Sequence, residues 1–186
     1  MTGVGGTTLM KCFHKEFRGL PYRFVSGGAL MRARQKDLGF ETIEEFSAYN
    51  AMHPEDGHDM WCDKTIATFG LHDMVVCESR LSHVFMPYAF KILLVCPLHI
   101  RARRRAGKKR DLGKTMLDMF IRDVNDTSRY ADLYPGCLWP ESDFDIVLDT
   151  SVWKPRQILK RIMLHHREWV EMLKSKAMIE NISVSK

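Results

Sequence analysis

The sequence has no long apolar run, no regular cysteine spacing and no internal repeat. Its longest apolar run, residues 92–97, is far shorter than the ~18 residues that a membrane span needs, and we find no pattern of a secretory signal. The five cysteines are odd in number and include no CxxC pair, so they favour reduced thiols over a disulfide framework. We therefore expect a cytoplasmic protein that does not enter the membrane.

The composition is that of a single globular domain with excess positive charge. The chain has 186 residues, of which 45% are hydrophobic and 27% charged, and its net charge is +5. A basic cluster within ten positions consists of Arg101, Arg103, Arg104, Arg105, Lys108, Lys109 and Arg110. Such a cluster favours an anionic partner, either nucleotide phosphates or nucleic acid. A solvated basic loop has the same composition, so composition alone does not decide between them.

Hydrophobic patterns predict alternating helices and strands. Helical periodicity covers residues 7–17, 29–38, 43–53, 59–69 and a long segment from 155 onward. Thr42 and Glu45 form a capping box before the third of these. Short apolar runs, typical of strands covered on both faces, occupy residues 22–25, 74–77, 90–95 and 146–148. The sequence therefore predicts an α/β fold with a mostly parallel sheet.

Small and charged residues follow the ends of three predicted strands. These segments are Ser26-Gly27-Gly28, Glu78-Ser79-Arg80 and Asp149-Thr150-Ser151. Ligands of open α/β sheets bind at the carboxyl ends of the strands. The three segments are thus candidates for a binding site, although turns and helix caps also occur at strand ends.

A glycine-rich segment, Gly3-Val4-Gly5-Gly6-Thr7-Thr8, precedes the first predicted helix. Glycines at a helix start let backbone N–H groups face a phosphate. In the phosphate-loop pattern G-x-x-x-x-G-K-[ST], Gly5 would be the second glycine and Thr7 the hydroxyl that holds Mg²⁺. Gly6 then stands at the lysine position.

The same alignment places the first loop glycine one position before Met1. The strand that feeds such a loop is absent from the sequence, and in a sheet of this kind it lies centrally between two parallel neighbours. We therefore expect that the given sequence begins after this strand. The other interpretation is that residues 3–8 are a flexible N-terminal segment, and these residues alone leave both open.

The order of motifs along the chain resembles the archaeal-type cytidylate kinases over nearly its whole length. The motifs that carry the resemblance are 24–28 with Arg32, Ile43-Glu44-Glu45-Phe46, His53-Pro54-Glu55, Asp59 with Asp63, Glu78-Ser79-Arg80-Leu81, the basic segment 97–105, Arg129-Tyr130 followed by Tyr134, and 144–151. Three departures from the family pattern are Gly6 in place of the loop lysine, Ser79 in place of a glycine, and the absence of the first strand and first loop glycine from the sequence. Each reduces the expectation of activity more than that of the fold.

The resemblance implies a P-loop three-layer sandwich of the nucleoside-monophosphate-kinase type, with a mostly parallel sheet whose first strand is missing or truncated. One domain would span residues 1–186, with a helical monophosphate-binding segment at about 28–70 and a basic lid at about 101–136. The implied reaction is the ATP- and Mg²⁺-dependent phosphorylation of CMP or dCMP to the diphosphate. The implied partners are nucleotides, and we expect a monomer.

The resemblance also implies a role for each candidate site residue. The ATP phosphates would lie on Gly3, Gly5, Gly6, Thr7 and Thr8, with Mg²⁺ on Thr7. The monophosphate would be bound by Gly27, Arg32, Asp59, Asp63, Glu78 and Arg80, because guanidinium groups match phosphate oxygens. Charge on the transferring phosphoryl group would be neutralised by the lid arginines Arg103, Arg122 and Arg129.

Structural roles compete with several of these assignments. Arg32 and Arg80 could pair with surface carboxylates, although the position of Arg80 after a buried strand favours function. Asp59 and Asp63 are four residues apart, a spacing that a solvated helix face also gives. His58 and Cys62 share a helix face, but a zinc site would need two further ligands.

Two other functions remain open from the sequence. The first is a nucleotide-binding protein of this fold that has lost catalysis, which Gly6 and Ser79 favour. The second is a nucleic-acid-binding module built on the basic cluster. We rank this second function last because no aromatic residues interleave with the cluster, as single-strand binding requires.

Overall fold

The computed structural model describes residues 2–72, 74–108, 110–136 and 139–184. Lys109 of the basic cluster lies outside the described residues, as does the cysteine at 137. Among the described residues the other four cysteines are free thiols, and no helix is both long and apolar enough to cross a membrane.

Four short strands lie where the apolar runs predict them. They are β1 (Arg23–Ser26), β2 (Val75–Glu78), β3 (Ile92–Val95) and β4 (Ile146–Asp149). β1 pairs with β2 in parallel, with Val25 opposite Cys77, and β3 pairs with β4 in parallel, with Leu94 opposite Leu148. The parallel arrangement is confirmed, but the described strands form two two-stranded sheets rather than one.

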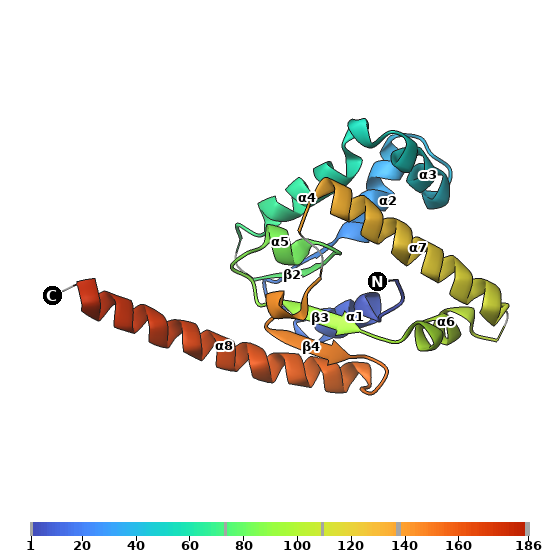
Figure 1. Ribbon diagram of the computed structural model, residues 1–186. Coiled ribbons are helices and arrows are strands. Elements are labelled where there is room, and N and C mark those ends of the chain that lie inside the picture. Colours follow the sequence, from blue (N-terminus) through green and yellow to red (C-terminus); the bar gives the residue numbers. More distant parts are fainter. Residues whose placement is uncertain (1, 73, 109, 137–138, 185–186) are drawn as a thin grey trace.

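Helices make up most of the chain, so the fold is mixed α/β and mostly helical (Figure 1). They are α1 (Gly6–Glu16), α2 (Gly27–Asp37), α3 (Ile43–Met52), α4 (His58–Phe69), α5 (Ser82–Phe85), α6 (Leu98–Ala106), α7 (Leu112–Leu133) and α8 (Pro155–Val184), with 3-10 turns at Pro54–Asp56 and Glu141–Asp143. Local chemistry sets several helix starts. The Thr42 hydroxyl accepts the Glu45 N–H (3.1 Å) before α3, and Asp111 Oδ1 accepts the Lys114 N–H (2.6 Å) before α7. Pro155 begins α8, where its missing N–H costs nothing.

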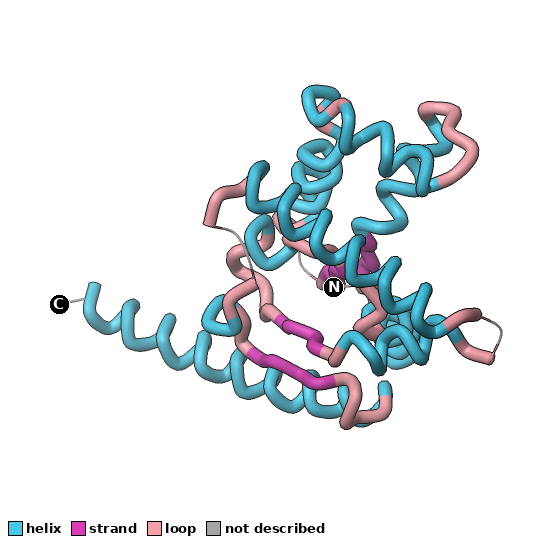
Figure 2. Tube along the Cα trace, turned by 45° about the vertical axis from the view of Figure 1, so that its right-hand side comes forward, coloured by secondary structure: helices cyan, strands magenta, loops and turns pink. Residues whose placement is uncertain are grey.

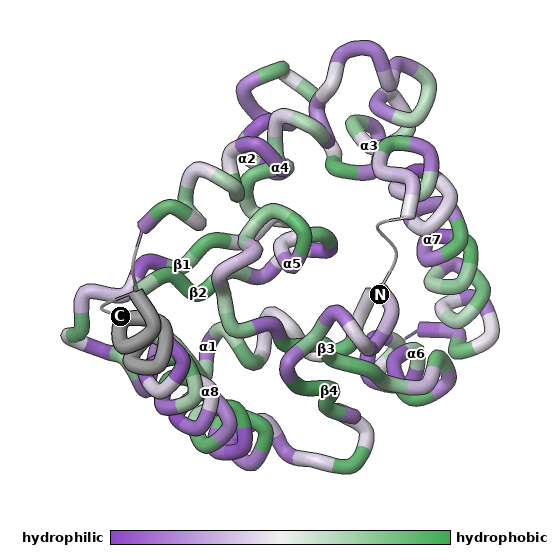
Figure 3. Tube along the Cα trace, turned by 60° about the vertical axis from the view of Figure 1, so that its left-hand side comes forward, coloured by the Kyte–Doolittle hydropathy of each residue, from purple (hydrophilic) through white to green (hydrophobic). Residues whose placement is uncertain are grey.

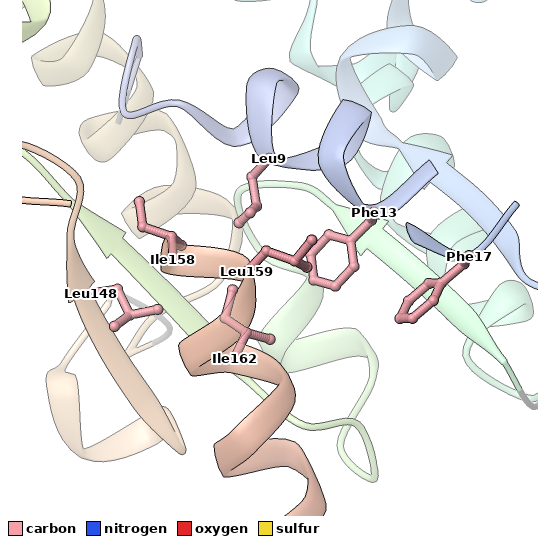
Figure 4. Packing of buried hydrophobic residues seen from close by; sticks show 7 residues of the cluster. All are labelled: Leu9, Phe13, Phe17, Leu148, Ile158, Leu159 and Ile162. Carbon is pink, nitrogen blue, oxygen red and sulfur yellow. The ribbon is translucent and has the colours of Figure 1, made fainter. Parts of the chain in front are cut away.

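One hydrophobic core lies between α1, α8 and the strands (Figure 4). Its buried side chains are Leu9, Phe13, Phe17, Leu148, Ile158, Leu159 and Ile162. Phe24 and Val76 from the first sheet pack against this core, and so do Ile92, Leu94 and Ile146 from the second. Both sheets therefore contribute one face to a single core.

A second core covers the opposite face of the first sheet. Val25 from β1 is buried against Cys62 and Ile66 of α4 and against Met86, and Val75 and Cys77 pack at its border. Neighbouring residues of β1 and β2 thus point to opposite cores, which explains why these strands are apolar without alternation. Above this core, α7 extends from the region of α4 to α6 (Figure 1).

Candidate functional site

The carboxyl ends of both sheets meet at the glycine-rich segment. Glu78, the last residue of β2, places Oε1 2.6 Å from the position that a Cβ would take at Gly6. Thr150, directly after β4, donates its hydroxyl to the Val4 carbonyl (2.8 Å). A cavity of about 3310 Å³ opens here and is lined by residues 2–10 together with these strand ends.

The start of α1 is open to an anion. Gly3 (φ 77°) and Gly5 (φ 103°) adopt left-handed backbone conformations that favour glycine. Gly5 is the N-cap of α1 and no side chain caps the helix. The N–H groups of the first turn, which includes Thr7 and Thr8, therefore have no intrahelical acceptor, and this turn with its partial positive charge lines the cavity.

Charged side chains hold the N-terminal segment in this position. Buried Arg101 donates to the Thr2 carbonyl (2.7 Å) and pairs with Asp123 (2.7 Å). Asp123 also accepts the Thr2 N–H (2.9 Å). Burial alone would raise the pKa of Asp123, but the hydrogen bonds from Thr2 and Arg101 outweigh it, so the net pKa is lowered.

Arg80 and Arg129 meet at one carboxylate on α7. Asp126 contacts Arg80 at 2.5 Å and Arg129 at 3.1 Å, and Arg122 lies 4.0 Å away. Arg80 also donates to the Thr2 hydroxyl (3.0 Å), which joins this arginine cluster to the glycine-rich segment. Guanidinium groups that converge on a carboxylate have the charge and geometry to bind a phosphate.

Asp59 and Asp63 of α4 lie beside this cluster. Asp59 accepts from Asn50 Nδ2 (3.1 Å) and pairs with Arg129 (3.4 Å). Asp63 accepts from the Tyr134 hydroxyl (2.8 Å). Burial is the main cause that raises the pKa of both carboxyls, to about 6 for Asp63. The two aspartates are thus buried in the cavity wall. The alternative interpretation, that they lie on a solvated helix face, is therefore wrong.

The monophosphate candidates Gly27 and Arg32 lie on α2, whose start contacts α4 through the Gly27 carbonyl and the Cys62 thiol. Gly27 begins α2 and has Ser79 Oγ 3.0 Å from its would-be Cβ, so the Ser79 side chain lies against this glycine. Arg32 is exposed, lines the cavity and makes no ion pair with any described residue. It therefore has a guanidinium available to a ligand.

Within the described part of the basic cluster, Arg101 is buried, whereas Arg103, Arg104 and Arg105 are exposed. Arg104 donates to the Thr150 carbonyl (2.5 Å) and hydroxyl (3.1 Å), and both Arg101 and Arg104 line the cavity. Arg103 is exposed on α6 and does not line it. Arg122 and Arg129 of α7 do line the cavity. The structure thus brings together every predicted site residue except Arg103.

Three residues of the site were missed by sequence reasoning. Asp123 and Asp126 hold the arginines of the cavity, and Tyr134 holds Asp63. The sequence does contain a pattern that indicates the two aspartates of α7. Charged residues recur there at helical spacings of three and four, at Arg122, Asp123, Asp126 and Arg129. Such charge patterns also occur on solvated helices, so the spacing alone does not identify a site.

The site can hold a hard cation only with help from a substrate. Among the described residues, no group of three or more His, Cys, Asp or Glu side chains is arranged to hold a metal ion. The Cys62 thiol, four residues from His58, donates to the Gly27 carbonyl at 3.7 Å. Mg²⁺ usually binds one or two protein oxygens and completes its shell with phosphates and water. The Thr7 hydroxyl and the Glu78 carboxylate, on adjoining segments, fit that donor set.

Comparison with known proteins identifies relatives over most of the chain. The cytidylate kinase of Pyrococcus furiosus is 30% identical over 160 residues, which cover 83% of this chain and 79% of the relative. The cytidylate kinase of Methanobrevibacter smithii is 29% identical over 169 residues, covering 88% and 92%, and that of Pyrococcus abyssi is 28% identical and covers 85% of both chains. No family profile matches the chain, and no solved structure matches it.

Proposed function

The chain belongs to the cytidylate kinase family, and on that premise we propose that it transfers the γ-phosphoryl group of ATP to CMP or dCMP. A phosphate oxygen of the monophosphate attacks the γ-phosphorus, the bond to the β,γ-bridging oxygen breaks, and ADP leaves. The fold proposed with this function is the P-loop three-layer sandwich of nucleoside-monophosphate kinases.

One observation carries the proposal: the uncapped start of α1 and the Arg80–Arg129 cluster line the same cavity. Phosphoryl transfer needs a donor and an acceptor in line, with fixed positive charge around the transferring group. The contact between Arg80 and the Thr2 hydroxyl (3.0 Å) brings these two anion-binding regions next to each other.

The donor phosphates are assigned to the glycine-rich segment. Gly5 has open space where a side chain would lie, which leaves room for phosphate oxygens, and the N–H groups at Thr7 and Thr8 donate to them. Gly3 and Gly6 adjoin Gly5 in the same loop, with Met119 and Glu78 against them. Mg²⁺ would be held by the Thr7 hydroxyl and Glu78, and when bound it supplies neutralisation of the donor phosphates. Since Gly6 stands in place of a lysine, the arginines of the cavity supply the remaining positive charge.

The acceptor is assigned to α2, α4 and the segment after β2. Arg32 and Arg80 bind the monophosphate by paired hydrogen bonds, and Gly27 lets the backbone approach it. Asp59 and Asp63 bind the sugar or base. When the nucleotide binds, the contact of Asp59 with Arg129 or that of Asp63 with Tyr134 is replaced by a contact with the nucleotide.

The lid arginines act when the site closes. Arg122 and Arg129 already line the cavity, whereas Arg103 on α6 does not line it and would have to move to reach the transferring group. Closure excludes water, which strengthens every electrostatic contact inside.

A second function, nucleotide binding without phosphoryl transfer, is favoured by one specific observation. Glu78 Oε1 lies 2.6 Å from the would-be Cβ of Gly6, so a lysine at this position would displace Glu78. The glycine-rich loop therefore lacks the lysine ammonium group that usually binds the ATP phosphates in phosphate loops. Under this alternative the protein binds ATP and CMP at the same cavity but forms no diphosphate.

The experiment is a coupled assay that detects ADP, with ATP, Mg²⁺ and CMP, dCMP, UMP or AMP in turn. Arg80→Ala should reduce kcat/KM for CMP by about a hundredfold or more, because it removes charge from the acceptor phosphate. Arg156→Ala is the matched control, since Arg156 is exposed on α8 and does not line the cavity.

Each result of this assay has a distinct meaning. Turnover with CMP or dCMP that Arg80→Ala abolishes and Arg156→Ala preserves supports the kinase. Absence of turnover with saturable nucleotide binding by calorimetry refutes the kinase and supports the binding protein. Turnover that is equal in both variants refutes the assigned acceptor site.

A further inference from the structure

One side of α7 carries an exposed apolar stripe. Leu117, Phe120, Ile121 and Val124 recur at spacings of three and four residues, which put side chains on one face of a helix. They are 56%, 54%, 48% and 48% exposed. Three of them, Phe120, Ile121 and Val124, also border the cavity, yet none of the four is buried. Four large apolar neighbours form a contiguous patch, and such patches mark interaction sites.

The stripe faces away from the side of α7 that packs on the rest of the chain. The buried residues of α7 are Thr115, Met119 and Asp126. Ile121 follows Met119 by two residues and therefore lies about 200° around the helix from it. α7 is an outer helix of the molecule, and α6 packs beside its beginning (Figures 2 and 3). The stripe is therefore open to a partner.

Opposite charges lie at the two ends of the same face. Lys114 precedes the stripe and Asp132 follows it, about five complete helical turns later, so both lie along one side of α7. Both are exposed, and neither forms an ion pair with another described residue. If two α7 helices pack antiparallel, Lys114 lies near Asp132 of the partner subunit. In a parallel pair, like charges would meet and repel each other.

We propose that a second copy of this chain docks on the stripe, with the two α7 helices antiparallel about a twofold axis near Ile121. A twofold interface uses the same patch on both copies, and an apolar stripe with opposite charges at its ends is complementary to itself. Gly113 and Ser128 lie beyond the two ends of the stripe on the same side, and these small residues let two helices approach closely. The proposal differs from the monomer that the family resemblance implies.

The size of the stripe sets the strength of the pairing. Its four half-exposed side chains present roughly 400 Å² of apolar surface on each copy. A standard interface buries about 800 Å² on each partner, so the stripe supplies about half of that area. We therefore expect a reversible dimer with a Kd on the order of tens of micromolar.

The first test is sedimentation equilibrium of the full chain over about 1 to 500 μM, a range that spans this Kd. Ile121→Lys places a charge at the centre of the stripe and should keep the chain monomeric, because the ammonium group would be buried between the helices. Leu164→Lys is the matched control, since Leu164 is 55% exposed and lies on α8.

The second test examines the orientation of the two helices. Lys114→Glu and Asp132→Lys should each raise the Kd about three- to tenfold, because each removes two exposed ion pairs from the symmetric dimer. The double variant exchanges the charges and should restore the original Kd. Both substitutions suit the helix dipole, with an acid in the first turn of α7 and a base in the last, so the helix itself is preserved.

The expected result is a mass that rises from one chain to two with concentration in the original chain and in Leu164→Lys, but not in Ile121→Lys. A chain that stays monomeric over the whole range would overturn the proposal. So would a dimer that Ile121→Lys leaves unchanged, because the copies would then pair elsewhere. A double charge variant that fails to restore the Kd would overturn the antiparallel arrangement. None of these readouts requires phosphoryl transfer, so failure here is distinguishable from failure of the kinase assignment.

Discussion

Replacing Asp63 by asparagine should stabilise this protein at neutral pH. Asp63 is 5% exposed and accepts one hydrogen bond, from the Tyr134 hydroxyl. Burial is the main reason that its pKa rises from 3.8 to about 6; the nearby Asp59 charge raises it further, while Tyr134 and Arg129 oppose the rise. The amide of Asp63→Asn keeps an oxygen for Tyr134 but carries no charge to desolvate.

The sign of the pH dependence follows from linkage. A carboxyl whose folded pKa lies above its unfolded value keeps its proton in the folded state while the unfolded chain has lost it. The stability that this group provides is therefore complete below about pH 3.8 and is lost as the pH rises through about 6. At ~1.4 kcal/mol per pH unit, the two-unit difference corresponds to about 3 kcal/mol by pH 8.

The assay is urea unfolding of both chains at pH 4.5, 6 and 8. The free energy of unfolding of Asp63→Asn should exceed that of the original chain by about 3 kcal/mol at pH 8, with the difference shrinking toward pH 4. A difference that is constant across the pH range would refute the reasoning, and so would destabilisation at pH 8. If Asp63 binds the acceptor, the stabilised variant should also lose kcat/KM for CMP, as is common where a site sacrifices stability for function.

Three further predictions address the core, the buried arginine and the departure at Ser79. Ile66→Ala should lower the free energy of unfolding by about 2–5 kcal/mol, because Ile66 is fully buried; a urea titration that gives less than 1 kcal/mol would contradict the second core. Arg101→Lys should lower Tm by several degrees, because an ammonium group cannot reproduce the planar guanidinium that donates to the Cys96 and Thr2 carbonyls and to Asp123. An unchanged Tm in calorimetry would contradict this structural role of Arg101. Ser79→Gly should lower KM for CMP a few-fold with kcat nearly unchanged, because it removes the side chain beside the acceptor wall; a change in kcat alone in steady-state assays would show that Ser79 acts elsewhere.

Local patterns were sufficient to predict the elements. Apolar runs located all four strands, and Thr42 located the start of α3 because capping depends only on residues within one turn. Local patterns could not predict which strands pair with one another. Pairing of β2 and β3 with other strands depends on contacts between segments far apart in the chain, and no local property encodes them.

The candidate site was predictable in outline but not in its lid. Motif order placed Gly27, Asp59 and Arg80 at one cavity. Within α6, however, Arg101 and Arg104 are one turn apart and face the cavity together, whereas Arg103 is two positions from Arg101 and points elsewhere. A run of arginines carries no marker of which members face inward until the phase of the helix is known.

The long final helix bears on how the protein moves in solution. α8 has 30 residues and is therefore about 45 Å long, while a compact chain of 186 residues has a diameter of roughly 40 Å. Its early residues Ile158 and Ile162 are buried, but Leu164, Met172 and Leu173 are exposed, and the helix extends away from the rest of the chain (Figure 1). Such a body experiences more friction than a sphere of 21.6 kDa. It will elute early from a sizing column even as one chain, so mass must be measured by light scattering or sedimentation equilibrium.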